Sequence, residues 1–414
     1  MSNFSSGIEL LVPVSVVGHA GLGRSLADSS CGSPSSSLAQ RFTLDGDDAM
    51  EKHLADVCEN VSEGIRAIVP LSRLEGLLLA GGYGRGEGGV LTDEGGDKPY
   101  NDLEFYVFLK GSTLLNDRRY KRALHQHGER LSQLAGIEVE FKILSLHQLR
   151  RSGTSMFSYD FVTKHRWLIG DESLFAGCDH HRDAKAIPLH EATRLLFNRC
   201  TGLLYAKERF QRGVFTKEDG DFVGRNLAKA QLGIGDAIIA SRGEYHWSCM
   251  KRRERLAPLS VNADTAERQA LLHHHDAGVV FKLHPRRSVH SRVVLSHYYN
   301  ELSRLACKVW LTLETERLGK PFASVEDYAF HAMSKCPEQS GWRNALVNLR
   351  AFREPTDKPF RYPRERLFHA LALLLWDDFQ RPAVLAALQR ELRTKASDFP
   401  SLVHAYEQLW HQFN

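Results

Sequence analysis

The sequence has few of the features that would place it in a specialised class of protein. Its seven cysteines lie at long spacings with no Cys-x-x-Cys pair, so neither a disulfide framework nor a structural zinc site is expected. A reducing cytoplasm is the predicted location. No apolar run approaches the roughly 18 residues needed to cross a membrane. The short apolar run at 8–17 lacks the preceding Lys or Arg of a signal peptide.

An excess of charge of either sign is also lacking. The chain has 54 basic and 50 acidic residues, which leaves a net charge of +4. This balance does not by itself indicate a nucleic-acid partner. Hydrophobic residues make up 43% and charged residues 25% of the chain, which is ordinary for a globular protein. The 414 residues are enough for two or three domains.

The hydrophobic pattern divides the chain into three parts. Residues 1–45 are rich in Ser and Gly without a sustained period, which predicts a poorly ordered segment. Residues 46–180 mix strand and helix patterns, whereas 186–414 are helical almost throughout, with 284–297 as a candidate point of subdivision. The predicted fold class is therefore α+β: a small mixed sheet with helices, followed by a larger all-α domain.

Individual elements follow from the same periodicity. A helix is expected from about residue 47, and LEFYVFL at 103–109 is typical of a strand. IEVEFKIL at 137–144 alternates apolar and charged residues, as a half-buried strand does. A helix is predicted between these strands, at 114–135. The later predicted helices are 189–211, 221–242, 264–275, 298–317, 324–335, 341–353, 363–394 and 398–413.

Residues 81–89 read GGYGRGEGG, in which six of nine positions are glycine. Gly84, Gly86 and Gly89 formally match a dinucleotide-binding fingerprint, which requires a helix directly behind the glycines. The continuation VLTDEGGDKPYND holds two more glycines and a proline, which disfavour such a helix. A kinase glycine loop is disfavoured as well. The HRD at 181–183 is not followed by the expected asparagine, and DFG is absent.

Acids on the two predicted strands indicate a different use for the glycines. Asp102 and Glu104 are two residues apart, so strand periodicity directs both carboxylates to one face, where they can share a pair of divalent cations. Glu138 or Glu140 offers a third carboxylate on the later strand. Glycines upstream would let a triphosphate approach backbone amides closely. This combination is typical of nucleotidyl transfer; the alternative is a solvated edge strand with outward acids.

The order of these motifs resembles the DNA polymerase β-like nucleotidyltransferase superfamily. Its signature is a glycine turn, an acid-x-acid strand and a third acid on a following strand. The run Gly81–Glu87 also resembles the GS-x-x-RGE turn of antibiotic and minimal nucleotidyltransferases. The resemblance covers roughly residues 70–175 and reaches weakly into 225–245. It implies a nucleotidyltransferase-type sheet, Mg²⁺ or Mn²⁺ as cofactor, and transfer of an NMP group from an NTP to an acceptor hydroxyl with release of pyrophosphate.

The resemblance also implies roles for particular residues. Gly81 and Gly82 match the turn that receives the nucleotide phosphates. The catalytic and metal-binding acids would be Asp102, Glu104 and Glu140, with Glu138 as the alternate third acid.

Basic residues complete the predicted nucleotide site. Arg85 would either contact the triphosphate or brace the turn in an ion pair with Glu87. Lys229 and Arg225 lie four residues apart on one helix face and can reach a triphosphate; a solvated helix face is the alternative. Tyr245 is expected to be an ordinary buried aromatic rather than a stacking platform for a base.

Two departures from the family pattern keep a second hypothesis open. The second and third acids are Glu where Asp is more frequent, and 20 residues (102 − 82) separate Gly82 from Asp102. The chain could therefore be a catalytically inactive relative that senses nucleotides or binds proteins. For an active enzyme the acceptor is left open between a small molecule, a protein and an RNA end.

Two histidine clusters, DHHRD at 179–183 and HHHD at 273–276, are interpreted as surface histidines. Adjacent helical side chains point in different directions and cannot all bind one metal ion. Cys200 and Cys249 are expected to be small buried hydrophobic residues.

Overall fold

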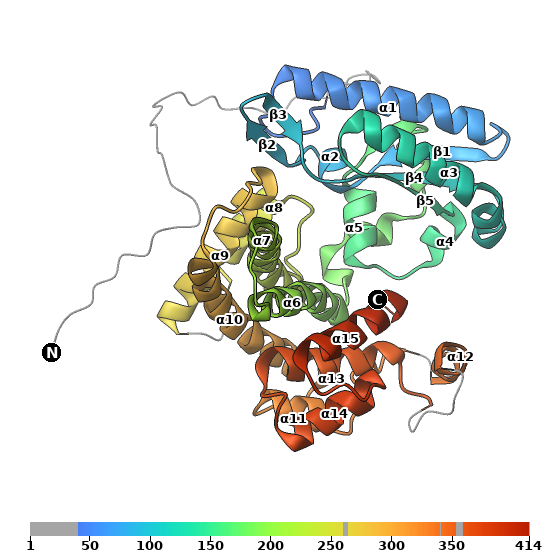
Figure 1. Cartoon of the computed structure of the whole chain (residues 1–414). Coiled ribbons are helices and arrows are strands. Elements are labelled where there is room, and N and C mark those ends of the chain that lie inside the picture. Colours follow the sequence, from blue (N-terminus) through green and yellow to red (C-terminus); the bar gives the residue numbers. More distant parts are fainter. Residues whose placement is uncertain (1–39, 260–263, 340, 353–358, 414) are drawn as a thin grey trace.

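The protein has a mixed α+β architecture, with a small sheet flanked by helices and a second part made of helices alone (Figure 1). The computed structural model describes residues 40–259, 264–339, 341–352 and 359–413. None of the helices in these ranges combines the length and the hydrophobicity needed to cross a membrane.

The sheet has four strands in the order β5-β4-β1-β6. Strand β4 pairs in parallel with β5, whereas β1 is antiparallel to both β4 and β6. A separate hairpin of β2 and β3 occupies part of the long stretch between Gly82 and Asp102. The strands are β1 (Leu74–Leu79), β2 (Val90–Asp93), β3 (Gly96–Pro99), β4 (Leu103–Leu109), β5 (Val139–Leu144) and β6 (Arg166–Ile169).

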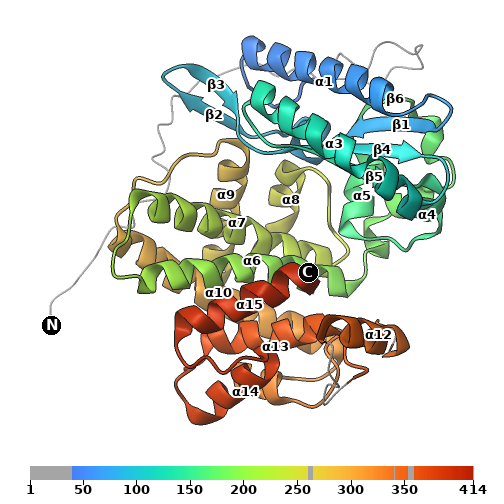
Figure 2. The same cartoon turned by 45° about the vertical axis from the view of Figure 1, so that its right-hand side comes forward.

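The alternating side chains of β4 serve two different layers. Leu103, Phe105 and Val107 are buried in one hydrophobic cluster with residues of α1 (Asp48–Ile68) and α3 (Thr113–Ala135). The intervening residues face the opposite side, where Tyr106 and Phe108 pack with residues of α4 (Leu146–Arg151) and α5 (Met156–Thr163). Figure 2 shows α1 and α3 on one side of the strands and the helical part on the other. Glu104 shares the face of Tyr106 and Phe108, because period two places these residues on one side.

The helical part has its own core, in which Trp310 is fully buried against Tyr328, Phe368 and Trp376. This cluster draws on residues from before and after 284–297. The helices are α6 (Leu189–Gln211), α7 (Lys217–Ser241), α8 (Cys249–Leu256), α9 (Thr265–Leu283), α10 (Arg292–Leu318), α11 (Val325–Phe330), α12 (Gly341–Phe352), α13 (Pro363–Trp376), α14 (Pro382–Leu392) and α15 (Phe399–Phe413).

Several predicted elements appear with shifted bounds. The strand expected at 103–109 and the helix expected at 189–211 are confirmed. The helix predicted at 363–394 is wrong, because α13 ends at Trp376 and a new helix begins at Pro382. Proline at the first helical position favours such a new start, and it disfavours continuation of the preceding helix.

The segment predicted to be poorly ordered, 1–45, is described only from residue 40. In that part Phe42 and Thr43 are buried, and their backbone N–H groups donate to the carboxylate of Glu51 on α1. Phe42 and Thr43 are thus packed against α1, contrary to the prediction for this segment, and 1–39 lie outside the described residues.

Candidate functional site: an acidic cluster beside the glycine turn

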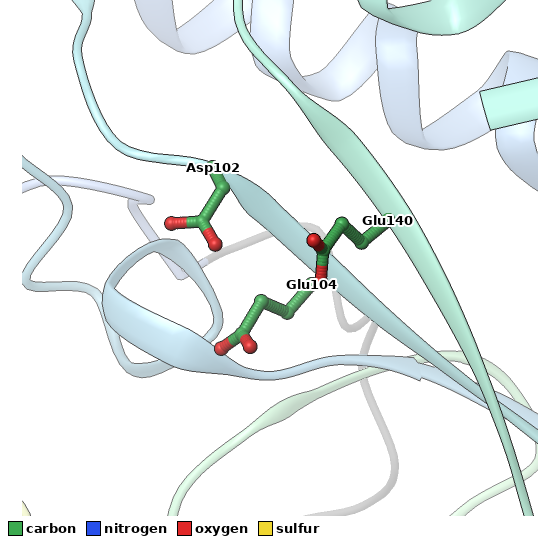
Figure 3. Close-up of side chains that lie close together, drawn as sticks. All are labelled: Asp102, Glu104 and Glu140. Atoms are coloured by element: carbon green, nitrogen blue, oxygen red, sulfur yellow. The ribbon is translucent and has the colours of Figure 1, made fainter. Parts of the chain in front are cut away.

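The three acids that the sequence singles out converge at the beginning of β4 and β5. Glu104 and Glu140 are direct register partners in the parallel pair of strands, and Asp102 immediately precedes β4. One carboxylate oxygen of each residue lies within 4.8 Å of the others (Figure 3). Glu138, the alternate third acid, is exposed and lies outside this cluster. The set Asp102, Glu104 and Glu140 is called the acidic cluster below.

A lysine that the sequence analysis did not single out lies against the acidic cluster. Lys142 Nζ is 2.8 Å from Glu104 Oε1 and 3.1 Å from Glu140 Oε2. Its ammonium group also lies 5.7 Å from the centre of the Tyr106 ring. Burial alone would lower the pKa of Lys142, but the hydrogen bond to Glu104 and the nearby negative charges raise it above its ordinary value. Side chains alternate along a strand, so Lys142 lies on the same face of β5 as Glu140. This spacing was visible in the sequence and could have been used to predict the contact.

The carboxylates also repel one another. Asp102 stays open to solvent, yet lost hydration raises its pKa, and the charges of Glu104 and Glu140 raise it further. Mutual repulsion of this kind is relieved by a cation. Three carboxylates are hard oxygen ligands of the type that Mg²⁺ and Mn²⁺ prefer, so the residues present fit such an ion.

The glycine run forms a short helical turn, α2 (Gly81–Arg85), whose tight packing explains two of its glycines. Gly81 has a φ of +67°, and a Cβ atom there would lie 3.1 Å from Glu104 Oε2. A Cβ atom on Gly84 would lie 2.2 Å from the carbonyl oxygen of Leu79, which no side chain can tolerate. After the run the chain enters β2, so no helix directly follows the glycines as a dinucleotide-binding fold requires.

Tyr83 fixes the glycine turn to the chain that leads into β4. Its side chain is fully buried, and its hydroxyl donates to the carbonyl of Gly89 at 2.8 Å. The same hydroxyl accepts the backbone N–H of Tyr100 at 2.8 Å, two residues before Asp102. One side chain therefore holds both the turn and the acid-bearing segment in place, a role that sequence alone did not indicate.

The ion pair predicted between Arg85 and Glu87 is absent, and each residue contacts a different element. Arg85 Nη1 lies 3.1 Å from Asp160 Oδ2 on α5. The buried Glu87 carboxylate accepts the hydroxyl of Ser248 and the backbone N–H of Cys249, at the beginning of α8. The turn is thus braced as expected, but by partners 75 or more positions away in the sequence.

Two lysines near the turn have no hydrogen-bond or ion-pair partner among the residues that the structure describes. Lost hydration lowers the pKa of Lys229, repulsion from Arg199 and Arg225 lowers it further, and Asp102 acts in the opposite direction. Burial also lowers the pKa of Lys282 on α9, and repulsion from Arg85 lowers it further. Asp102 thus acts electrostatically on Lys229, which the sequence predicts as a nucleotide-binding residue, whereas Lys282 was not predicted.

The interpretation of the two histidine clusters as surface residues is wrong for three of their members. His181, His274 and His275 are all buried. Nε2 of His275 lies 3.0 Å from Asp236 Oδ1, and the same carboxylate oxygen accepts from Arg252 Nε at 2.7 Å. A buried histidine with such partners has a structural role, and only the tertiary fold supplies those partners.

The other interpretations of single residues are confirmed. Tyr245, Cys200 and Cys249 are buried.

A cavity of about 590 Å³ lies at the far ends of β4 and β5. Residues 109–114 and 145–148 are among those that line it, and none of the three acids of the acidic cluster does so.

Comparison with known proteins gives no relative for this chain: no family model matches it, and neither a curated protein nor a solved structure does so.

Proposed function

We propose that the protein is a metal-dependent nucleotidyltransferase that transfers an NMP group from an NTP to an acceptor hydroxyl. The observation that carries this proposal is the convergence of three carboxylates, from two neighbouring strands, beside a glycine turn. An isolated acidic pair on a strand would be unremarkable. Here a third acid, Glu140, is the register partner of Glu104, and Gly81 of the turn lies directly beside Glu104. Together these two features favour a site for a complex of a metal ion with phosphate groups.

In this proposal the chain contributes ligands, a base and phosphate contacts. Asp102, Glu104 and Glu140 would hold Mg²⁺ or Mn²⁺, which when bound neutralises phosphate charge and makes a hydroxyl more acidic. The Glu140 carboxylate accepts the proton of the acceptor hydroxyl. The resulting oxygen attacks the α-phosphorus, the bond from that phosphorus to the β-phosphate oxygen breaks, and pyrophosphate leaves with the electron pair.

Backbone and basic groups near the turn suit the phosphates. Gly81 and Gly82 begin α2, where the first N–H groups have no acceptor within the helix. Lys229 is a cation without a protein partner among the described residues, and Asp102 acts on it electrostatically. Arg85 is committed to Asp160, so its role here is to brace the turn.

One observation favours the second candidate function, an inactive relative that binds nucleotides without turnover. Lys142 already neutralises part of the acidic cluster through Glu104 and Glu140. The two functions differ in one measurable product, because only the enzyme releases pyrophosphate.

The test is Mg²⁺-dependent pyrophosphate release from each of the four NTPs, with a cell extract as the source of acceptor. Asp102→Asn is expected to lower the rate by roughly 100-fold or more, since a metal ligand supplies several kcal/mol to the transition state. Glu138→Gln is the matched control, because it removes an acid two residues from Glu140 but outside the acidic cluster. Equal rates for Asp102→Asn and wild type would refute the catalytic assignment.

A further inference from the structure

Lys142 places a positive charge within the acidic cluster, between two of its three carboxylates. Its ammonium group bridges Glu104 and Glu140, the two acids that are register partners on β4 and β5. Lys142 is itself the register partner of Tyr106, whose ring it also approaches. Both contacts follow from the strand pairing, so the lysine belongs to the rigid sheet rather than to a mobile loop.

The bridge uses one oxygen of each glutamate and leaves the other available. Glu104 contacts Lys142 through Oε1, whereas its Oε2 is the atom nearest the Cβ position of Gly81. Glu140 contacts Lys142 through Oε2. Three negative charges and one positive charge leave two negative charges, which a single divalent ion balances.

We infer that Lys142 replaces one of the two divalent ions, so that the acidic cluster binds a single metal ion. This inference rests on the proposed function and refines its metal centre. Lys142 is a positioning residue: it holds Glu104 and Glu140 in place and supplies a fixed positive charge. The remaining oxygens of the two glutamates and the carboxylate of Asp102 are the ligands of the one ion.

Mn²⁺ binding to the full chain without nucleotide tests the inference, by calorimetry and by electron paramagnetic resonance of free Mn²⁺. Wild type is expected to bind one ion at the cluster, and Asp102→Asn is expected to lose it. Lys142→Met is expected to bind the first ion about tenfold more tightly and to accept a second one, because a positive charge a few ångströms away is removed. Lys142→Arg keeps the charge and is expected to retain a single ion.

Lys98→Met is the matched control, since Lys98 forms a 2.7 Å ion pair with Asp93 on the β2–β3 hairpin, outside the cluster. It should bind Mn²⁺ as wild type does. The inference is overturned if wild type binds two ions at the cluster, or if Lys142→Met keeps wild-type affinity and stoichiometry. In that case pyrophosphate release can still support the proposed function. Wild type that binds no Mn²⁺ would instead refute the metal centre of the proposed function itself.

Discussion

Replacement of Gly81 by alanine separates backbone strain from damage to the acidic cluster. Gly81 has a φ of +67°, where an L-residue costs about 1–2 kcal/mol relative to its ordinary conformations. The added Cβ atom would also lie 3.1 Å from Glu104 Oε2, which is closer than an ordinary contact. The Glu104 side chain can shift by a few tenths of an ångström, so the cost in stability is small, but the shift moves a carboxylate of the acidic cluster.

Gly136 provides a matched control for this substitution. It ends α3 with a φ of +71°, and a Cβ atom there would meet nothing within 4 Å. Both Gly81→Ala and Gly136→Ala should therefore lose about 1–2 kcal/mol of unfolding free energy from backbone strain alone. Only Gly81→Ala should weaken Mn²⁺ binding, by about tenfold or more, because metal sites tolerate little displacement of a ligand.

The assay combines urea unfolding with Mn²⁺ titration for the two variants and wild type. Equal Mn²⁺ affinity in all three proteins would refute the reasoning, since the Glu104 carboxylate would then not depend on the space at Gly81. An equal loss of affinity in both variants would show a global effect of the alanines and would refute it as well.

Two further substitutions test charged groups away from the acidic cluster. Glu87→Gln places an amide group against the hydrogen-bond donors of Ser248 and Cys249, and it should lower the free energy of unfolding in urea by about 1–3 kcal/mol. The same substitution at exposed Glu94 is the control. If Glu87→Gln costs no more than Glu94→Gln, the Glu87 carboxylate does not stabilise the turn. Burial raises the pKa of Glu391, but the hydrogen bonds from Arg361 and its positive charge outweigh this effect and hold the pKa at about 2 instead of 4.5. This stabilisation, on the order of 3 kcal/mol, is present above pH 4.5 and is lost as the pH falls toward 2. The difference in free energy of unfolding between wild type and Glu391→Gln should therefore become smaller as the pH is lowered. A difference that does not change with pH would disprove this assignment.

Local periodicity was sufficient to predict the acid-bearing strands. A strand places every second residue on one face, so Asp102 and Glu104 had to share a side of β4. The choice between Glu138 and Glu140 depends on which residue of β5 lies opposite Glu104. That register is a property of the strand pairing, and the sequence does not encode it locally.

The contacts of the glycine turn show where sequence proximity misleads. Arg85 and Glu87 are two positions apart with opposite charges, which favours the prediction of an ion pair. Gly86, with a φ of +81°, ends α2 between them and redirects the chain. Arg85 then reaches α5, and Glu87 reaches the beginning of α8, so the pairing is decided by tertiary packing.

Contacts of Asp160 and Glu87 link the glycine turn to the helical part. Asp160 accepts from Arg85 and also from the hydroxyl of Tyr245, which follows α7. Glu87 satisfies donors at the beginning of α8 on the other side of the turn. A shift of Tyr245 or of the beginning of α8 would therefore act on the turn, in which Gly81 lies so close to Glu104 that a Cβ atom on it would be 3.1 Å from Oε2.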